Sequence, residues 1–264
     1  MTKYTVSEIQ TFRECPRKHH YAYVELRIPK RDDEKLFVGQ LFHKGADIFW
    51  AGGTHADAIA MLNDSDADKH VKAKVGVMLA GYWARWEKPS GKVQNAVRIQ
   101  HDVIDGESDG IIDDVSNGRR LLRETKTTSM DIAPGGAYFN RLLLDTQVHL
   151  YADHFKCDLI MYDVVRKPAN KVRENVGEYV EAMAQSVMKD LDKYYQRYYF
   201  APEESIDRML DFYETVNLIK SGYKVKHDGS CMKWGSLCGY WGVCSGTQSI
   251  NELDLKDQKH MELK

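Results

Sequence analysis

The sequence lacks long apolar runs and an excess of positive charge. No stretch approaches the ~20 apolar residues of a membrane-spanning helix, and the N-terminal residues hold no apolar run of signal-peptide length. We therefore expect a cytoplasmic protein with no membrane partner. The chain carries 37 Lys and Arg against 39 Asp and Glu, for a net charge of −2. Bulk charge therefore cannot hold nucleic acid, and any DNA site must be a local patch.

Cysteine is scarce, and repeats and linkers are absent. The five cysteines are not expected to form disulfides in a reducing cytoplasm. A hydrophobic content of 43% is enough for a substantial core. We predict a single domain over residues 1–244, followed by a loose polar tail over residues 245–264 that shows no periodicity.

Helix-type spacing of apolar residues alternates with strand-type spacing along the chain. Thr5 and Glu8 form a capping-box pattern at the start of a first helix, and Pro16 suits the first turn of a second. Further helices are predicted over 35–50, 56–87 with a break near 63–65, 141–155, 174–200 and 202–220. Strands are predicted over 95–105, 108–113, 119–127 and 158–165. This order predicts an α/β fold.

The region between Asp109 and Lys126 carries the strongest chemical pattern. Asn117-Gly118 predicts a hairpin turn, so Asp109 and Glu124 should be neighbours on antiparallel strands. Glu124 and Lys126 share a face because alternate strand residues point the same way. Converging carboxylates suit Mg²⁺ or Mn²⁺, which can activate water against a phosphodiester. The alternative is a solvent-facing Glu124–Lys126 salt bridge of little energetic value.

The strings GESDGII at 106–112 and ETKT at 124–127 resemble motifs II and III of the PD-(D/E)XK nucleases, in particular the RecB-type branch that includes the AddB nuclease and the CRISPR-adaptation exonucleases. GQLFH at 39–43 and QVHLY at 147–151 are similar to two further motifs of that branch. The resemblance implies a restriction-endonuclease-like core, a small mixed sheet flanked by helices. It also implies metal ligation by His43, Asp109, Glu124 and the backbone carbonyl of Thr125. It assigns catalysis to Asp109, Glu124 and Lys126, with Gln147 and Tyr151 contacting DNA or the lysine.

Four cysteines suggest a thiolate-ligated centre. Six residues lie between Cys231 and Cys238, and five between Cys238 and Cys244. Cys15 can supply a fourth ligand if the chain ends meet. The spacing alone fits zinc, an iron–sulfur cluster or unliganded buried thiols. The resemblance implies a [4Fe–4S] cluster that joins the N- and C-terminal segments, and zinc is the alternative metal. The spacing between Cys231 and Cys238 is longer than the Cys-x-x-Cys common in the family. Cys157 is predicted to be a buried core thiol.

Basic and aromatic residues crowd the N-terminal segment, a pattern that suits single-stranded or frayed DNA ends. They are Arg13, Arg17, Lys18, Arg27, Lys30 and Arg31, interleaved with Tyr21 and Tyr23. Equally, the tyrosines can belong to the core and the charges to a solvated face.

The predicted function is a metal-dependent DNA nuclease, acting as an exonuclease on DNA ends in recombination, repair or phage or CRISPR DNA processing. The predicted partners are DNA and a protein of recombination or CRISPR adaptation. One alternative is a DNA-binding accessory protein of nuclease fold without turnover. Another is an iron–sulfur or zinc protein acting on something other than DNA.

Overall fold

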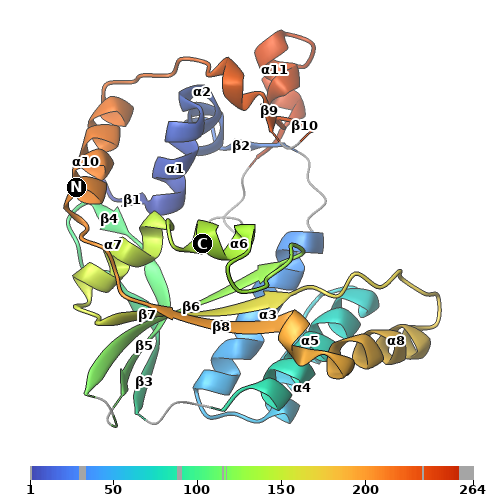
Figure 1. Ribbon diagram of the computed structural model, residues 1–264. Helices are drawn as coiled ribbons and strands as arrows, with labels where there is room; N and C mark the ends of the chain where they lie inside the picture. The colour runs from blue at the N-terminus through green and yellow to red at the C-terminus, as the bar shows by residue number, and fades with distance from the viewer. Residues whose placement is uncertain are drawn as a thin grey trace. The chain divides into compact units, whose positions relative to one another are not determined.

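The computed structural model describes residues 2–29, 34–87, 91–114, 116, 118–233 and 235–255 (Figure 1). The chain divides into two compact units. The terminal unit holds Met1–Asp32, Gln100–Gly106 and Ile206–Lys264, and the sheet unit holds Asp33–Ile99 and Glu107–Ser205. The single domain expected over residues 1–244 stays a prediction. No helix among the described residues is long and apolar enough to cross a membrane.

The sheet unit is built on a five-stranded mixed sheet of order β3-β5-β6-β7-β8. Its strands are β3 (Lys92–Arg98), β5 (Glu107–Asp114), β6 (Arg119–Thr128), β7 (Leu159–Arg166) and β8 (Tyr195–Phe200). The central strands β6 and β7 pair in parallel, and the remaining neighbours pair antiparallel. The mixed sheet and its helices confirm the predicted α/β class and are consistent with a restriction-endonuclease-like core.

Helices cover both faces of this sheet (Figure 1). Helices α3 (Glu34–Trp50), α4 (His55–Asp64), α5 (Lys69–Arg85) and α8 (Val176–Lys189) share one hydrophobic core with the side chains of Leu121 and Met161. Helix α7 (Thr146–His154) lies against β6 and β7 and, with α6 (Ala137–Leu142), is drawn on the other side of the sheet. Strand residues alternate between two faces, so β6 presents a helix-core face through Leu121 and an α7 face through Glu124.

The terminal unit joins segments from both ends of the sequence. It contains β1 (Tyr4–Thr5), α1 (Val6–Glu14), α2 (Pro16–His19), a π-helical turn (His20–Val24), β2 (Arg27–Ile28), β4 (Ile104–Asp105), α10 (Ile206–Lys220), a 3-10 turn (Asp228–Ser230), β9 (Met232–Lys233), β10 (Ser236–Leu237), α11 (Trp241–Ser245), a second 3-10 turn (Ile250–Glu252) and β11 (Asp254–Leu255). Strand β1 pairs in parallel with β4, and β2 pairs antiparallel with β11. Thr5 caps α1 as predicted, by accepting a hydrogen bond from the Glu8 backbone N–H at 3.2 Å, but the Glu8 carboxylate contacts His19 Nε2 at 3.0 Å and does not complete the predicted capping box.

The prediction of one helix over 174–200 was wrong at its C-terminal end. After α8 and the short α9 (Leu191–Tyr194), the chain forms β8 beside β7. The segment YQRYYF is rich in aromatic residues, which favour strands. Tyr195 is buried and donates its hydroxyl to the Met78 carbonyl at 2.8 Å. Tertiary packing therefore overrides the helical pattern.

Three further boundaries differ from the predictions. The helix expected over 141–155 is interrupted, because the Asp145 side chain accepts from the Gln147 N–H at 3.1 Å and starts α7 there. The strand expected over 95–105 ends at Arg98, and the next pairing residues belong to β4. The tail expected over 245–264 contains the 3-10 turn Ile250–Glu252 and strand β11, and Leu253 between them is buried. Asn117 of the predicted turn lies outside the described residues, although β5 and β6 do form the antiparallel hairpin.

Candidate active site

Asp109 and Glu124 meet on the sheet unit as the hairpin predicts. Strand β5 pairs with β6 in the register Gly110↔Arg123, which places the preceding residue, Asp109, beside Glu124. Asp109 Oδ2 accepts a hydrogen bond from the Thr125 backbone N–H at 2.6 Å. The β6 backbone therefore orients one oxygen of the Asp109 carboxylate.

Glu124 is the more enclosed of the two acids, with 4% of its surface exposed. Its Oε1 accepts hydrogen bonds from Lys126 Nζ at 2.7 Å and from Gln147 Nε2 at 3.2 Å. Its Oε2 is buried and has no hydrogen-bond partner among the residues that the structure describes. The Glu124–Lys126 pair thus exists, but Glu124 is buried and 27% of the Lys126 side chain is exposed, so the pair does not lie on an open surface as the solvent-facing alternative expects. One carboxylate oxygen is held in place, and the other is left for a cation or a proton.

The charges of these groups depend on one another. Burial raises the pKa of Glu124 above its usual value, and the negative charges of Asp109 and Asp145 add to this against the opposing effect of Lys126. Burial alone would raise the pKa of Asp109, but His43, Arg123 and the Thr125 N–H outweigh it and hold that pKa well below its usual range. Burial would lower the pKa of Lys126, but the surrounding carboxylates raise it. Lys126 is therefore charged beside two different carboxyl groups. Asp109 stays ionised, and Glu124 binds a proton more readily than an ordinary glutamate.

His43 reaches this site from α3. Its Nδ1 lies 3.6 Å from Asp109 Oδ2, and 34% of its side chain is exposed. Burial acts to lower the pKa of His43, but the contact with Asp109 raises it overall. Gly39 explains the close approach of the helix, since a Cβ there would lie 3.1 Å from Thr127 Oγ1 on β6. The predicted motif residue is therefore adjacent to the carboxylates.

The remaining predicted site residues differ in what they reach. Gln147 contacts Glu124, rather than the lysine or an open surface. Tyr151, one turn farther along α7, is 3% exposed and buried in the interior. Thr125 is 1% exposed, and its hydroxyl accepts from Arg123 Nη1 at 3.4 Å. Gln147 and Thr125 thus join the site directly.

Sequence reasoning missed Arg123, which is fully buried behind the site. Its Nη2 donates to the Asp109 carbonyl, to Asn95 Oδ1 at 3.1 Å and to Asp47 Oδ1 at 3.3 Å. Asp47 lies one turn beyond His43 on α3. The signal was present in the sequence, because a charged residue at a helix-core position of β6 requires buried partners. Arg123 ties α3, β3 and β5 together beneath the carboxylates.

Asp145 was missed as well. It lies just before α7, and its Oδ2 is 3.8 Å from Lys126 Nζ. The signal was an N-cap residue two positions before Gln147, which the prediction of an unbroken helix concealed.

The four terminal-unit cysteines are free thiols, as is Cys157. Burial raises the pKa of Cys231 and of Cys244, and the nearby Cys15 and Cys238 raise both further. Within the part of the chain that is described, no group of three or more His, Cys, Asp or Glu side chains is arranged to hold a metal ion. The cluster therefore finds no support in this geometry. Cys157 is buried as predicted, and burial raises its pKa to about 12.

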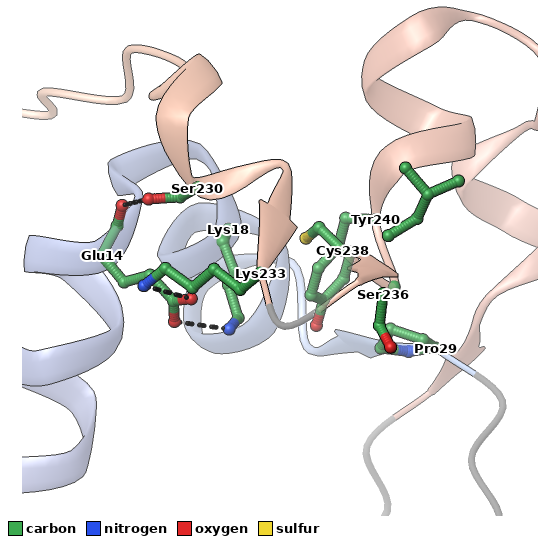
Figure 2. A pocket seen from close by; sticks show the side chains of 10 residues that line it. Glu14, Lys18, Pro29, Ser230, Lys233, Ser236, Cys238 and Tyr240 are labelled. Atoms are coloured by element: carbon green, nitrogen blue, oxygen red, sulfur yellow. Dashed lines mark hydrogen bonds and ion pairs between the residues drawn. The ribbon is translucent and has the colours of Figure 1, made fainter.

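A cavity of about 270 Å³ adjoins Cys238 in the terminal unit. Figure 2 shows Lys18 and Lys233 on either side of the Glu14 carboxylate, at 2.7 and 3.0 Å. One carboxylate between two ammonium groups leaves a single surplus positive charge among these three. Lys18 of the predicted DNA surface is therefore already paired within the protein.

Other residues of that predicted surface also have internal partners. Arg13 pairs with Asp211, and Arg27 Nη1 donates to the Leu253 carbonyl at 3.3 Å. Tyr21 is buried in a small apolar cluster. Lys30 and Arg31 lie outside the described residues. These partners favour a structural role for much of the segment.

Comparison with known proteins gives one match to a protein-family model. The model of the PD-(D/E)XK nuclease superfamily matches residues 3–245, a span that includes Asp109, Glu124 and Lys126. Among solved structures, SSO0001 is 12% identical, with 92% of this chain and 98% of that chain covered and a TM-score of 0.38. A phage related exonuclease from Haemophilus somnus 129PT is 15% identical, with 84% and 96% covered and a TM-score of 0.38. No curated protein matches the chain.

Proposed function

Since this chain belongs to the PD-(D/E)XK nuclease superfamily, we propose that it is a metal-dependent DNA nuclease whose site is formed by Asp109, Glu124 and Lys126. The observation that carries the proposal is the buried Glu124 Oε2, which finds no hydrogen-bond partner within the described part of the chain and lies next to a second carboxylate and a charged lysine. An unsatisfied buried carboxylate oxygen is costly. A divalent cation held between the two acids removes that cost.

The carboxylate pair is of the kind that Mg²⁺ and Mn²⁺ prefer, although no third His, Cys, Asp or Glu among the described residues is arranged with it to hold a metal ion. Magnesium is commonly held by one or two carboxylates, with water and substrate oxygens completing its shell. Asp109 and Glu124 supply such a pair, and His43 and the Thr125 carbonyl are the additional ligands that the family resemblance assigns. When bound, the metal would lower the pKa of a water ligand and stabilise charge at phosphorus.

The chain's own residues then orient the reacting groups. Lys126 is held charged in the site and supplies a positive charge toward a phosphate oxygen. Gln147 holds Glu124 Oε1 from α7, which leaves the buried Oε2 as the carboxylate oxygen available to a cation. Arg123 holds the Asp109 main chain from the opposite face. The site is therefore prepared before substrate arrives.

The finer proposal is cleavage from a free DNA end. It is supported by the likeness of the His43 and QVHLY motifs to the RecB-type branch. The four-cysteine centre, with [4Fe–4S] before zinc, stays a prediction from the same resemblance, and no step is derived through it. Anaerobically purified protein with about four irons per chain would establish the cluster, one zinc would replace it, and metal-free stable protein would remove it.

The test uses end-labelled single- and double-stranded DNA beside a covalently closed circle, with Mg²⁺, Mn²⁺ or EDTA. We expect linear DNA to be degraded with metal and to survive in EDTA. Asp109→Ala, Glu124→Gln and Lys126→Ala should abolish cleavage. Asp113→Asn is the matched control, because Asp113 is a half-exposed acid on β5, the strand that carries Asp109, and contacts Arg120 outside the site. Binding without cleavage by the wild-type protein would favour the accessory-protein alternative, and a cleaved circle would overturn end dependence.

A further inference from the structure

Lys126 lies between two carboxylates, not one. Its Nζ is 2.7 Å from Glu124 Oε1 and 3.8 Å from Asp145 Oδ2. Resting on the proposed nuclease function, we infer that Asp145 is a positioning residue. It keeps the Lys126 ammonium in the site when a metal ion bound to Glu124 weakens the attraction between Glu124 and Lys126.

Asp145 is itself held firmly. Its Oδ1 accepts from the Gln147 N–H at 3.1 Å, and its Oδ2 accepts from the Tyr162 hydroxyl at 2.9 Å. Tyr162 is fully buried on β7 and lies opposite Glu124 in the β6–β7 register. Burial and the charge of Asp145 raise the pKa of Tyr162, so its hydroxyl stays a donor. The Asp145 carboxylate is thus fixed with one oxygen toward Lys126.

Lys126 needs a second anion because the Glu124 oxygen that it contacts also accepts another hydrogen bond and would lose charge to a bound cation. Glu124 Oε1 already accepts from Lys126 and Gln147, and a cation at Oε2 would withdraw charge from that oxygen. An ammonium that loses its partner in a largely enclosed place is destabilised. Lysine is also flexible, and 27% of the Lys126 side chain is open to solvent. Asp145 retains the ammonium beside the phosphate instead of releasing it to water.

The competing explanation is that Asp145 is only the N-cap of α7. Asparagine caps helices about as well as aspartate, so Asp145→Asn keeps the cap and removes the charge. Asp145→Ala removes both. The matched control is Asp68→Asn, because Asp68 caps α5 through the same type of bond to the His70 N–H at 2.7 Å.

The experiment measures kcat and KM of the full chain on linear DNA with Mg²⁺, together with urea midpoints. Asp145→Asn should lower kcat about 10- to 100-fold, the size of loss that follows removal of a partner holding an active-site group in place, with KM and the urea midpoint near wild type. Tyr162→Phe should move kcat in the same direction by less, and Asp68→Asn should leave kcat unchanged.

Wild-type kcat in Asp145→Asn overturns the inference, as does a kcat loss that merely follows a lowered urea midpoint. A wild-type protein that cleaves no DNA with either metal overturns the proposed function, and the inference falls with it. Cleavage by wild type with an unaffected Asp145→Asn overturns the inference alone.

Discussion

Removal of Arg197 should strongly destabilise the sheet unit. This residue of β8 contacts both carboxylate oxygens of Asp163 on β7, with Nε–Oδ1 at 2.5 Å and Nη2–Oδ2 at 2.9 Å. Asp163 is fully buried, and 8% of the Arg197 side chain is exposed. The Tyr82 hydroxyl donates to the same carboxylate. In the β6–β7 register Asp163 also lies opposite Thr125, so the pair supports the strand that carries the candidate site.

The expected magnitude follows from what the substitution leaves behind. In Arg197→Met, the Asp163 carboxylate stays buried and loses both charge-assisted hydrogen bonds from Arg197. Its hydrogen bond from the Tyr82 hydroxyl remains. Removing one partner of a buried ion pair lowers the unfolding free energy by about 3–5 kcal/mol, because the other charge is left buried without its partner. Asp163→Asn combined with Arg197→Met buries no charge and keeps an acceptor for Tyr82. This double variant should therefore be more stable than Arg197→Met alone by roughly 2 kcal/mol or more.

Urea unfolding followed by tryptophan fluorescence suits the measurement, because Trp50 and Trp86 lie against Arg197, with ring centroids 5.3 and 4.4 Å from its guanidinium carbon. The control is Arg166→Met, which breaks the exposed pair with Asp131 and should cost no more than about 1 kcal/mol. If Arg197→Met loses no more stability than the control, the pair is not a major support of this unit. If the double variant is the least stable of all, the buried-charge explanation is refuted.

Three further outcomes are expected. Arg123→Lys keeps the charge but loses the fork that reaches the Asp109 carbonyl, so single-turnover cleavage should slow about 10-fold or more, the equivalent of one charge-assisted hydrogen bond. Gly110→Ala should lose both stability and activity in urea and cleavage assays, since its Cβ would lie 2.8 Å from the Gln94 carbonyl. Burial raises the pKa of Cys157 to about 12, so this thiol in the native protein should resist alkylation by iodoacetamide at pH 8, as followed by mass spectrometry of the peptide that contains it. Because the unfolded thiol ionises near ~8.5, this contribution to stability should fall as pH rises from there toward 12.

The parts that were predictable from sequence are those fixed by short-range patterns. The β5–β6 hairpin follows from alternating residues and a turn signal, and its pairing brings Asp109 beside Glu124. Lys126 follows because it shares a strand face with Glu124. His43 was placed by resemblance, and the structure sets it 3.6 Å from Asp109. None of these needed knowledge of the whole fold.

The parts that were missed depend on contacts between distant segments. Strand β8 has local spacing that suits a helix, yet Tyr195 is drawn to Met78 on α5. Arg123 finds its partners on α3 and β3, through Asp47 and Asn95. No local pattern reveals which polar groups surround a buried charge, so its role required the three-dimensional arrangement.

Side chains alternate between the two faces of the sheet along β6, so residues on both faces contribute to one site. Glu124 and Lys126 point toward α7, and Arg123 and Thr125 point toward the helix core. Arg123 therefore places a permanent positive charge behind Asp109 and helps hold the pKa of that acid low. Glu124 lies on the opposite side from Arg123, and burial beside two other carboxylates raises its pKa instead. One acid is thus prepared to stay ionised, while the other gains from an added cation. Under the proposed function, a divalent metal held by both carboxylates would supply that cation at Glu124 Oε2, and this asymmetry is the physical reason why we propose metal-dependent hydrolysis for the pair.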